Sequence, residues 1–280
     1  MIEQEWLQKP PLGVPINWGH LHSTRQVGCY LLNEGSGSRV NDLSGTANAG
    51  TLGGDATWGI GEKGPHLAFA GVDGRAALTY SNPFFDCGLA PLSVMAIAKT
   101  SAHAETYGNM FRYDNSNANG LFGLRIGLGK LQFLIADAAR TVASVSSTAN
   151  WNDGNWHSFV GTRIGASMNV YVDGVDAGNG ITTGADKNIV AASAALAAIG
   201  ALWNSASSAW TEEFIGSIAC VYVAYEGWSP STVQSLHIRP YAMFDWPRLW
   251  AVAAAAGNWL RSPFDAGFNV KNPVYDYGWQ

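Results

Sequence analysis

The chain is 280 residues long, carries a formal net charge of −5, and has only 13% charged residues. This length allows one large β domain or two small ones, and it is sufficient to bury a core without a metal or a disulfide. Because phosphate binding requires clustered Lys and Arg, the acidic balance and the lack of a basic run argue against nucleic acid as a partner. The 33 glycines favour short strands and tight turns over long helices.

The N-terminal segment, residues 1–26, contains prolines and tryptophans without a hydrophobic period, and we expect it to form an extended arm. Residues 1–6 are acidic and are soon followed by Pro10 and Pro11, so they lack the basic start and apolar core of a secretory signal. The most apolar late stretch, residues 249–260, is shorter than the roughly 20 residues that cross a bilayer. We therefore expect synthesis in a cytoplasm without a signal peptide, and no membrane insertion.

The middle of the chain, residues 27–239, carries repeated strand and turn signals. Apolar residues alternate with polar ones over short runs, which predict strands at residues 67–70, 76–80, 93–98, 121–126, 130–135, 156–162, 168–172 and 214–224. Asp173 and Gly174 lie between two valines and predict a tight turn, because both positions must accept positive φ. Ser229 followed by Pro230 predicts the start of one short helix.

These strands are separated by polar turns, and nothing alternates strand with long helix. The pattern predicts an all-β fold, an antiparallel two-sheet sandwich over residues 27–239. Gly216 is expected to let the last strand pass close to its neighbour. Cys29, Cys87 and Cys220 are too few and too widely spaced for a disulfide framework or a zinc site, so we interpret them as buried free thiols.

The C-terminal segment, residues 240–280, is again rich in Pro, Trp, Phe and Asn and is expected to form a second arm. Exposed aromatic residues in the two arms would make a large apolar surface, which soluble monomers avoid. We therefore expect the arms to pack against neighbouring subunits in a homo-oligomer. The residues expected at this interface are Trp6, Trp18, Phe244, Trp246, Trp250, Trp259, Phe264 and Trp279.

Several short motifs, taken together in order and spacing, resemble a known family. They occupy residues 28–37, 41–45, 48–50, 67–69, 153–157, 170–174, 214–218 and 228–229. The ordered set resembles the laminin-G-like, concanavalin A-like lectin/glucanase family over residues 27–239. The resemblance implies a concanavalin A-like jelly-roll sandwich.

Within these motifs, Trp156 and His157 allow a more detailed expectation. Trp156 is expected to fill the core between the two sheets. His157 then points to the opposite face, because strand side chains alternate, and we expect it to make a structural hydrogen bond.

Catalytic motifs are not recognised in this sequence. Glucanase relatives carry a Glu-x-Asp-x-x-Glu run that places carboxylates on one face of a strand, and this chain lacks such a run. Glu212 and Glu213 are adjacent, so on a strand they would face opposite ways. Residues 59–64 match Gly-x-Gly-x-x-Gly, but Pro65 and a strand follow, so we interpret this segment as a loop. We expect no enzymatic activity and no required cofactor.

The sequence contains candidate residues for two kinds of ligand site, a calcium site and a glycan site. Because many relatives hold a structural calcium, the resemblance makes Asp42, Asn48 and Asp73 candidate calcium ligands, although Asp42 and Asp73 could equally serve only as turn residues. Aromatic residues beside amides suit glycan binding at loop tips. The candidates are Trp151, Asn152, Trp203, Asn204 and Trp210. The alternative is that these tryptophans pack on loops or against another subunit.

The flanking segments resemble a narrower group. Residues 10–17, leading into residues 27–34, and residues 239–244 look like parts of sandwich proteins encoded by tailed bacteriophages and prophages. This resemblance implies a non-enzymatic virion structural protein, made in the bacterial host cytoplasm, displayed on the particle surface as a capsid decoration or tail component, and anchored to other virion proteins through its arms. The alternative function is a carbohydrate-binding module for glycan attachment, and a glycoside hydrolase ranks last.

Overall fold

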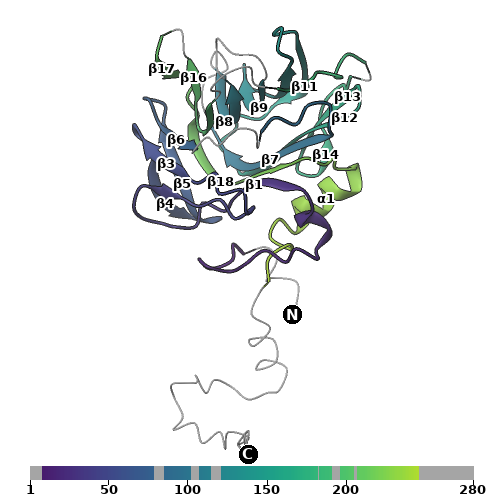
Figure 1. Ribbon diagram of the computed structural model, residues 1–280. Coiled ribbons are helices and arrows are strands. Elements are labelled where there is room, and N and C mark those ends of the chain that lie inside the picture. The colour runs from purple at the N-terminus through teal and green to yellow at the C-terminus, as the bar shows by residue number, and fades with distance from the viewer. Residues whose placement is uncertain are drawn as a thin grey trace, which may run out of the picture. The chain divides into compact units, whose positions relative to one another are not determined.

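Two eight-stranded antiparallel sheets stack face to face in the computed structural model (Figure 1). The structure describes residues 8–78, 85–101, 107–114, 121–181, 183–190, 196–204 and 207–245. The first sheet contains, in spatial order, β14 (Val175–Asp176), β13 (Ser167–Val172), β12 (His157–Ile164), β7 (Leu92–Lys99), β18 (Ile215–Ala224), β5 (Gly64–Ala70) and β4 (Thr57–Gly61), with β1 (Gln26–Tyr30) also paired to β18.

The second sheet and the remaining elements complete the sandwich. Its strands, in spatial order, are β11 (Val142–Asn150), β10 (Lys130–Ala136), β9 (Leu121–Gly127), β8 (Tyr107–Asp114), β15 (Leu196–Ile199), β6 (Arg75–Leu78), β3 (Gly50–Gly53) and β2 (Arg39–Val40). A separate hairpin is formed by β16 (Leu202–Asn204) and β17 (Ala209–Thr211), and the described residues also form the 3₁₀ helix η2 (Leu21–Ser23) and the α-helix α1 (Pro230–Ile238). Among the described residues, no helix has the length and apolar character needed to cross a membrane.

The predicted fold class is confirmed: the molecule is an all-β two-sheet sandwich with one short α-helix after its last strand. Helix α1 starts where expected, because the Ser229 side chain accepts a hydrogen bond from the Thr232 backbone N–H and Pro230 occupies the first turn. The predicted tight turn is confirmed by φ values of 51° at Asp173 and 79° at Gly174.

One local prediction was wrong. Residues 59–64, expected to be a loop, belong to a β-hairpin in which Gly61 at the end of β4 pairs with Gly64 at the start of β5. The two glycines flank Glu62 and Lys63, and Gly64 has a φ of 73°, which fits a type I turn followed by a glycine in the left-handed region. Pro65 is tolerated as the second residue of β5 because it pairs with Ile60 of β4 at the margin of the sheet.

The principal core lies between the sheets. Alternate residues of each strand point inward, as Phe122, Leu124 and Ile126 do on β9, and all three are buried. Four aromatic rings (Phe85, Phe111, Tyr113 and Phe122) form one cluster, with ring centroids 5.3–6.2 Å apart. Burial of each such side chain stabilises the fold by about 1.5–3 kcal/mol, so this alternation holds the two sheets together.

A second apolar cluster covers the outer face of the first sheet. Met95, Ile97, Val160 and Tyr222 point away from the core between the sheets and are buried. Covering this face are Ile16, Trp228, Leu236, Tyr241 and Phe244, which come from α1 and from the chain segments on either side of the sandwich.

The two flanking segments are tied to each other and to the sandwich. Ile16 and Phe244 form a β-bridge, and the Asn17 backbone N–H donates to the Met243 carbonyl at 2.8 Å. The Lys9 ammonium is inserted more deeply and donates to the carbonyls of Leu32 at 3.2 Å, Ala219 at 2.5 Å, and Pro65. The described parts of both segments therefore belong to the packed structure.

The three cysteines are confirmed as free and buried. Burial raises the pKa of Cys87 and of Cys220 to about 11, and raises that of Cys29 as well. Gly216 also has its expected role, because a Cβ there would lie 2.1 Å from the Lys99 carbonyl oxygen on the neighbouring strand.

The predicted face of Trp156 was wrong. Trp156 packs against the outer apolar cluster, with its ring 5.2 Å from the Lys99 ammonium. His157 instead contacts Trp151 and Phe159 on the inner side, with ring centroids 5.1 and 5.7 Å away. Alternation across this pair is confirmed, but the faces are exchanged, because β12 begins at His157 and places Phe159 in the core between the sheets.

Candidate functional site

The loops that carry the predicted glycan-binding residues meet at one end of the sandwich. The Gly154 backbone N–H donates to the Thr100 carbonyl at 2.9 Å, and the Thr100 hydroxyl donates to the Ile215 carbonyl at 2.6 Å. The Trp151 backbone N–H donates to the Gly129 carbonyl at 2.8 Å. These bonds connect the ends of β7, β9 and β11 with the starts of β12 and β18, so segments far apart in the sequence share one rim.

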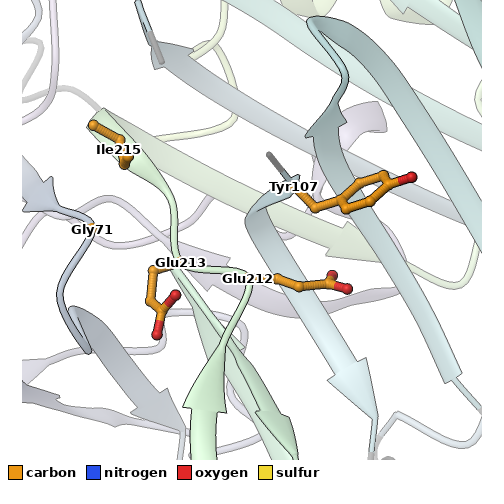
Figure 2. A pocket seen from close by; sticks show the side chains of 5 residues that line it. All are labelled: Gly71, Tyr107, Glu212, Glu213 and Ile215. Atoms are coloured by element: carbon orange, nitrogen blue, oxygen red, sulfur yellow. The ribbon is translucent and has the colours of Figure 1, made fainter. Parts of the chain in front are cut away.

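A pocket of about 270 Å³ opens at this rim (Figure 2). Its lining residues come from the β5–β6 turn, the start of β8 and the segment between β17 and β18: Gly71, Tyr107, Glu212, Glu213 and Ile215. The pocket therefore lies where both sheets end, and it combines a phenol ring, an aliphatic side chain and two carboxylates.

Arg125 on β9 is the best-fixed polar group beside this pocket. Its guanidinium carbon lies 4.1 Å from the centroid of the Tyr107 ring, which is a cation–π geometry. Its Nη1 group donates to Glu212 Oε2 at 3.0 Å, and its Nε donates to Gln132 Oε1 at 3.0 Å. Its Nη2 group has no hydrogen-bond partner among the described residues, and Arg125 contacts the lining residues Tyr107 and Glu212.

Glu212 is held in an uncommon backbone conformation. Its φ is 50°, a value that costs a non-glycine residue of order 1 kcal/mol or more. Asn109 compensates, because its backbone N–H and its Nδ2 donate to the Glu212 carbonyl at 3.2 and 3.0 Å, and Nδ2 also reaches Glu212 Oε2 at 3.2 Å. These hydrogen bonds hold the Glu212 carboxylate beside Arg125. Glu212 Oε1 has no hydrogen-bond partner in the described part of the chain.

The electrostatics of this ion pair reflect its partial burial. Side-chain exposure is 18% for Arg125 and 30% for Glu212. Burial lowers the pKa of Arg125, and the Glu212 carboxylate opposes this effect. Both groups are therefore shielded enough to stay in place, yet remain reachable from the rim.

Two glycines on β9 make room for this arrangement. A Cβ at Gly127 would lie 2.6 Å from Tyr107 Cδ1 and 2.6 Å from Gln132 Oε1. A Cβ at Gly123 would lie 2.6 Å from Cδ of Arg112, the next arginine on this face. Since Gly123, Arg125 and Gly127 alternate with the core residues of β9, they all lie on the outer face of the second sheet.

Next to the pocket, the β16–β17 hairpin presents a pair of tryptophans. Trp203 and Trp210 are cross-strand partners with ring centroids 5.2 Å apart at 62°. The Arg75 guanidinium lies 5.0 Å from the Trp210 ring and pairs with Asp73 at 2.7 Å. The structure thus brings two predicted glycan-binding residues together, half-exposed and close in sequence to Glu212.

The other predicted glycan-binding residues lie differently. Asn204 Oδ1 accepts a hydrogen bond from the Ser207 backbone N–H at 3.3 Å within the hairpin turn. Trp151 packs on the core between the sheets, and its Nε1 is buried without a hydrogen-bond partner in the described structure. Asn152 is half-buried beside the Gly129 turn. Trp151 and Asn152 therefore share the rim with the pocket but are not among its lining residues.

The predicted calcium ligand Asp42 already accepts four hydrogen bonds, three from its own loop and one from β1. Oδ1 accepts from the backbone N–H groups of Cys29 and Ser44 at 3.0 and 2.9 Å. Oδ2 accepts from the Thr46 hydroxyl at 2.8 Å and from the Asn48 N–H at 3.1 Å. This is the turn-stabilising role considered as the alternative.

The third calcium candidate lies apart from these two. Asp73 is exposed in the β5–β6 turn with a φ of 63°, and it pairs with Arg75 at 2.7 Å. No group of three or more His, Cys, Asp or Glu side chains within the described residues could hold a metal ion. The donor set present suits hydrogen bonding better than cation binding.

Two of the residues predicted at an interface can be located. Trp18 is 54% exposed, whereas Phe244 is 1% exposed and packs in the outer apolar cluster of its own chain. The other six lie outside the described residues: Trp6, Trp246, Trp250, Trp259, Phe264 and Trp279.

The adjacent carboxylates of Glu212 and Glu213 lie between β17 and β18 rather than on a strand. Figure 2 shows Glu212 directed toward Tyr107 and Glu213 directed away from it. Sequence reasoning missed the contribution of Glu212, and also missed Tyr107, Arg125 and Gln132. The pattern Gly-Leu-Arg-Ile-Gly over residues 123–127 was the available signal, because it places one arginine between two glycines on a single strand face.

Comparison with protein families gives one match. The family described as the Concanavalin A-like lectin/glucanases superfamily matches residues 73–234, which include most of the strands of both sheets and every lining residue of the pocket except Gly71. No curated protein sequence matches this chain.

Solved structures with the same fold include domains of toxins and of an arabinanase. The binding domain of Paraclostridial Mosquitocidal Protein 1 has a TM-score of 0.59 at 8% identity, covering 77% of this chain and 52% of that one. The ligand-binding domain of botulinum neurotoxin serotype D, solved with N-acetylneuraminic acid, has a TM-score of 0.58 at 12% identity, with coverages of 77% and 51%. This chain therefore spans about half the length of these toxin domains.

The third example is matched over nearly its whole length. Domain 4 of AbnA, an extracellular arabinanase from Geobacillus stearothermophilus solved with arabinotriose, has a TM-score of 0.57 at 17% identity. The match covers 76% of this chain and 98% of that one. At these identities the likeness concerns the fold alone.

Proposed function

Because the chain belongs to the Concanavalin A-like lectin/glucanases superfamily, we propose that it is a carbohydrate-binding domain without catalytic activity. Its binding site is the pocket beside Arg125, extended by the Trp203–Trp210 hairpin. The observation that carries this proposal is the Arg125 guanidinium, fixed on Tyr107 by Glu212 and Gln132, with one donor unpaired beside the pocket that Tyr107 and Glu212 line. Structures of the same fold that hold sialic acid and arabinotriose support it.

The chemistry of the site suits a sugar. Each sugar hydroxyl both donates and accepts hydrogen bonds, and here the Arg125 Nη2 donor and the Glu212 Oε1 acceptor belong to one ion pair. The Tyr107 and Trp210 rings supply flat apolar surface for the C–H faces of a sugar ring. Because both polar groups are fixed before binding, a ligand loses little free energy in ordering them.

Two observations support the absence of catalysis. A glycosidase needs one carboxylic acid with a raised pKa and a second carboxylate, separated by about 5–9.5 Å across the scissile bond. Here the Glu212 carboxylate is ion-paired with Arg125, and Glu213 is directed elsewhere (Figure 2). We expect no release of reducing sugar when the protein is incubated with any glycan that it binds.

Replacing Arg125 tests the site. We expect Arg125→Met to weaken the binding of a glycan identified on an array by about tenfold or more, because a charge-assisted hydrogen bond and the position of Glu212 are lost. The matched control is Arg39→Met, an exposed arginine on the far edge strand of the same sheet. Titration calorimetry should show the control within twofold of the wild type. Equal affinity of Arg125→Met and wild type would contradict the proposal.

We propose virion attachment as a second candidate, which can coexist with glycan binding in one protein. It is supported by the sequence resemblance of the flanking segments and by the aromatic composition of residues 246–280. Deletion of residues 246–280 should then abolish incorporation into particles while leaving glycan binding intact. Unchanged assembly of the truncated protein would remove this candidate.

A further inference from the structure

We infer that the pocket selects uncharged glycans and rejects glycans that carry a carboxylate. The inference rests on the proposed carbohydrate-binding function and specifies its ligand class. Its basis is the charge of the lining: Glu212 and Glu213 are both acidic, and none of the lining residues is a lysine or an arginine. Because Glu212 is paired with Arg125, a carboxylate that entered the pocket would meet the unpaired charge of Glu213.

The arginines near the pocket do not reverse this balance, because each is already paired. Arg125 pairs with Glu212 at 3.0 Å, and Arg75 pairs with Asp73 at 2.7 Å. Arg112 is buried, with 9% of its side chain exposed, and pairs with Asp114 at 3.2 Å. These three arginines are therefore balanced by their partners, and Lys130, which lies opposite Gly127 on the same face, is not among the residues that line the pocket.

Glu213 supplies the remaining negative charge. It forms no ion pair within the described part of the molecule, and it is half-buried at the pocket. A like-charge repulsion over a few ångströms is modest in bulk water and several times stronger where the surroundings are less polar. Affinity differences of about tenfold or more between matched neutral and acidic glycans are therefore expected.

The likeness to a toxin domain that holds N-acetylneuraminic acid does not argue for an acidic ligand here. That likeness is 12% in sequence and concerns the fold, whereas ligand charge is decided by the side chains of the pocket. The charge of the preferred ligand is therefore expected to differ between this chain and such neighbours, and it can be measured.

The experiment compares glycan pairs that differ by one carboxylate. Lactose with sialyllactose, and xylotriose with its glucuronylated form, are titrated against the full chain alongside a wider array of neutral oligosaccharides. We expect the neutral member of a binding pair to bind at least about tenfold more tightly, with the ratio decreasing at high salt. Glu213→Gln should reduce the ratio, and Glu62→Gln, an equal charge change in the exposed β4–β5 turn, should not.

Each outcome decides a different point. Equal or tighter binding of the acidic members would overturn the inference and leave carbohydrate binding intact. A neutral preference that Glu213→Gln does not alter would overturn the assignment to Glu213. Binding of no glycan at all would overturn the proposed function itself, and this inference with it.

Discussion

The two sheets use their outer faces in opposite ways. On the first sheet, Met95, Ile97 and Tyr222 are sealed beneath Trp228 and Phe244. On the second sheet, the corresponding outward positions of β8, β9 and β10 carry arginines, glycines and a glutamine, which form the polar network beside the pocket. Both faces arise from the same alternation of side chains, but among the described residues the first sheet has the larger apolar cover, whereas the second has the small buried pair of Leu134 and Ala136.

This difference separates stability from recognition. Apolar outward residues need a cover, and α1 with the two flanking segments supplies it for the first sheet. The second sheet can keep outward donors and acceptors because its neighbouring glycines leave space for long side chains. We therefore expect substitutions on the first face to change the free energy of unfolding, and substitutions on the second face to change binding.

The largest expected effect is on the covered face. Trp228 is 1% exposed, and Trp228→Ala should lower the free energy of unfolding by about 3–5 kcal/mol because it leaves a cavity beneath α1. Ile238→Ala, at a 51% exposed position of the same helix, should cost no more than about 0.5 kcal/mol. Urea unfolding measures both.

The same measurement on Arg125→Met sharpens the contrast. This variant should unfold within about 1 kcal/mol of the wild type, because exposed or partly exposed ion pairs contribute little to stability. A loss as large as that of Trp228→Ala would remove the division of roles between the two faces.

Lys9 gives the next largest effect, and it depends on pH. Burial lowers the pKa of Lys9 to about 8 from its ordinary value of 10.5. Between these values the unfolded chain binds more protons than the folded chain, so folding stability rises with pH through this window. Relative to Lys9→Met, the wild type should gain up to about 3 kcal/mol between pH 8 and pH 10.5. If the stability difference between the wild type and Lys9→Met stays constant or falls over this pH range, the folded protein accommodates the Lys9 ammonium at least as well as water does.

His157 gives the smallest effect and lies at the rim, between the two regions. Its Nδ1 is 2.7 Å from Asp173 Oδ2, and this hydrogen bond raises the pKa of His157. The protonated form therefore stabilises the fold below the ordinary value of 6.5, and this contribution disappears as pH rises through the raised pKa. Relative to His157→Gln, the wild type should lose about 1 kcal/mol or less between pH 5.5 and pH 8. Glycan binding should follow no such profile, since His157 does not line the pocket.

The predicted strands could be located because each has its own local pattern. The strands predicted over residues 93–98 and 130–135, and the Asp173–Gly174 turn, agree with the structure because short apolar runs and one tight turn determine them locally, although residues 93–98 are buried on both faces. The family resemblance over residues 27–239 was recognised for the same reason, since its motifs are strands and turns in a fixed order. The hairpin at residues 59–64 was not predicted, because its glycines are typical of a loop and do not indicate that β4 pairs with β5.

What the sequence by itself determined about this protein is therefore the sandwich, its family and the lack of a paired-acid motif on one strand. Only the tertiary structure decided that Trp156 faces the outer cluster, since a shift of one residue in the start of β12 reverses every side chain that follows. The pocket also depends on the tertiary structure, because Arg125 and Glu212 are 87 residues apart in the sequence. They meet because β8 pairs with β9 and the chain returns to this end of the sheet after β17. Local patterns specify the faces of a strand, whereas a site made from several strand ends depends on how the strands pair in three dimensions.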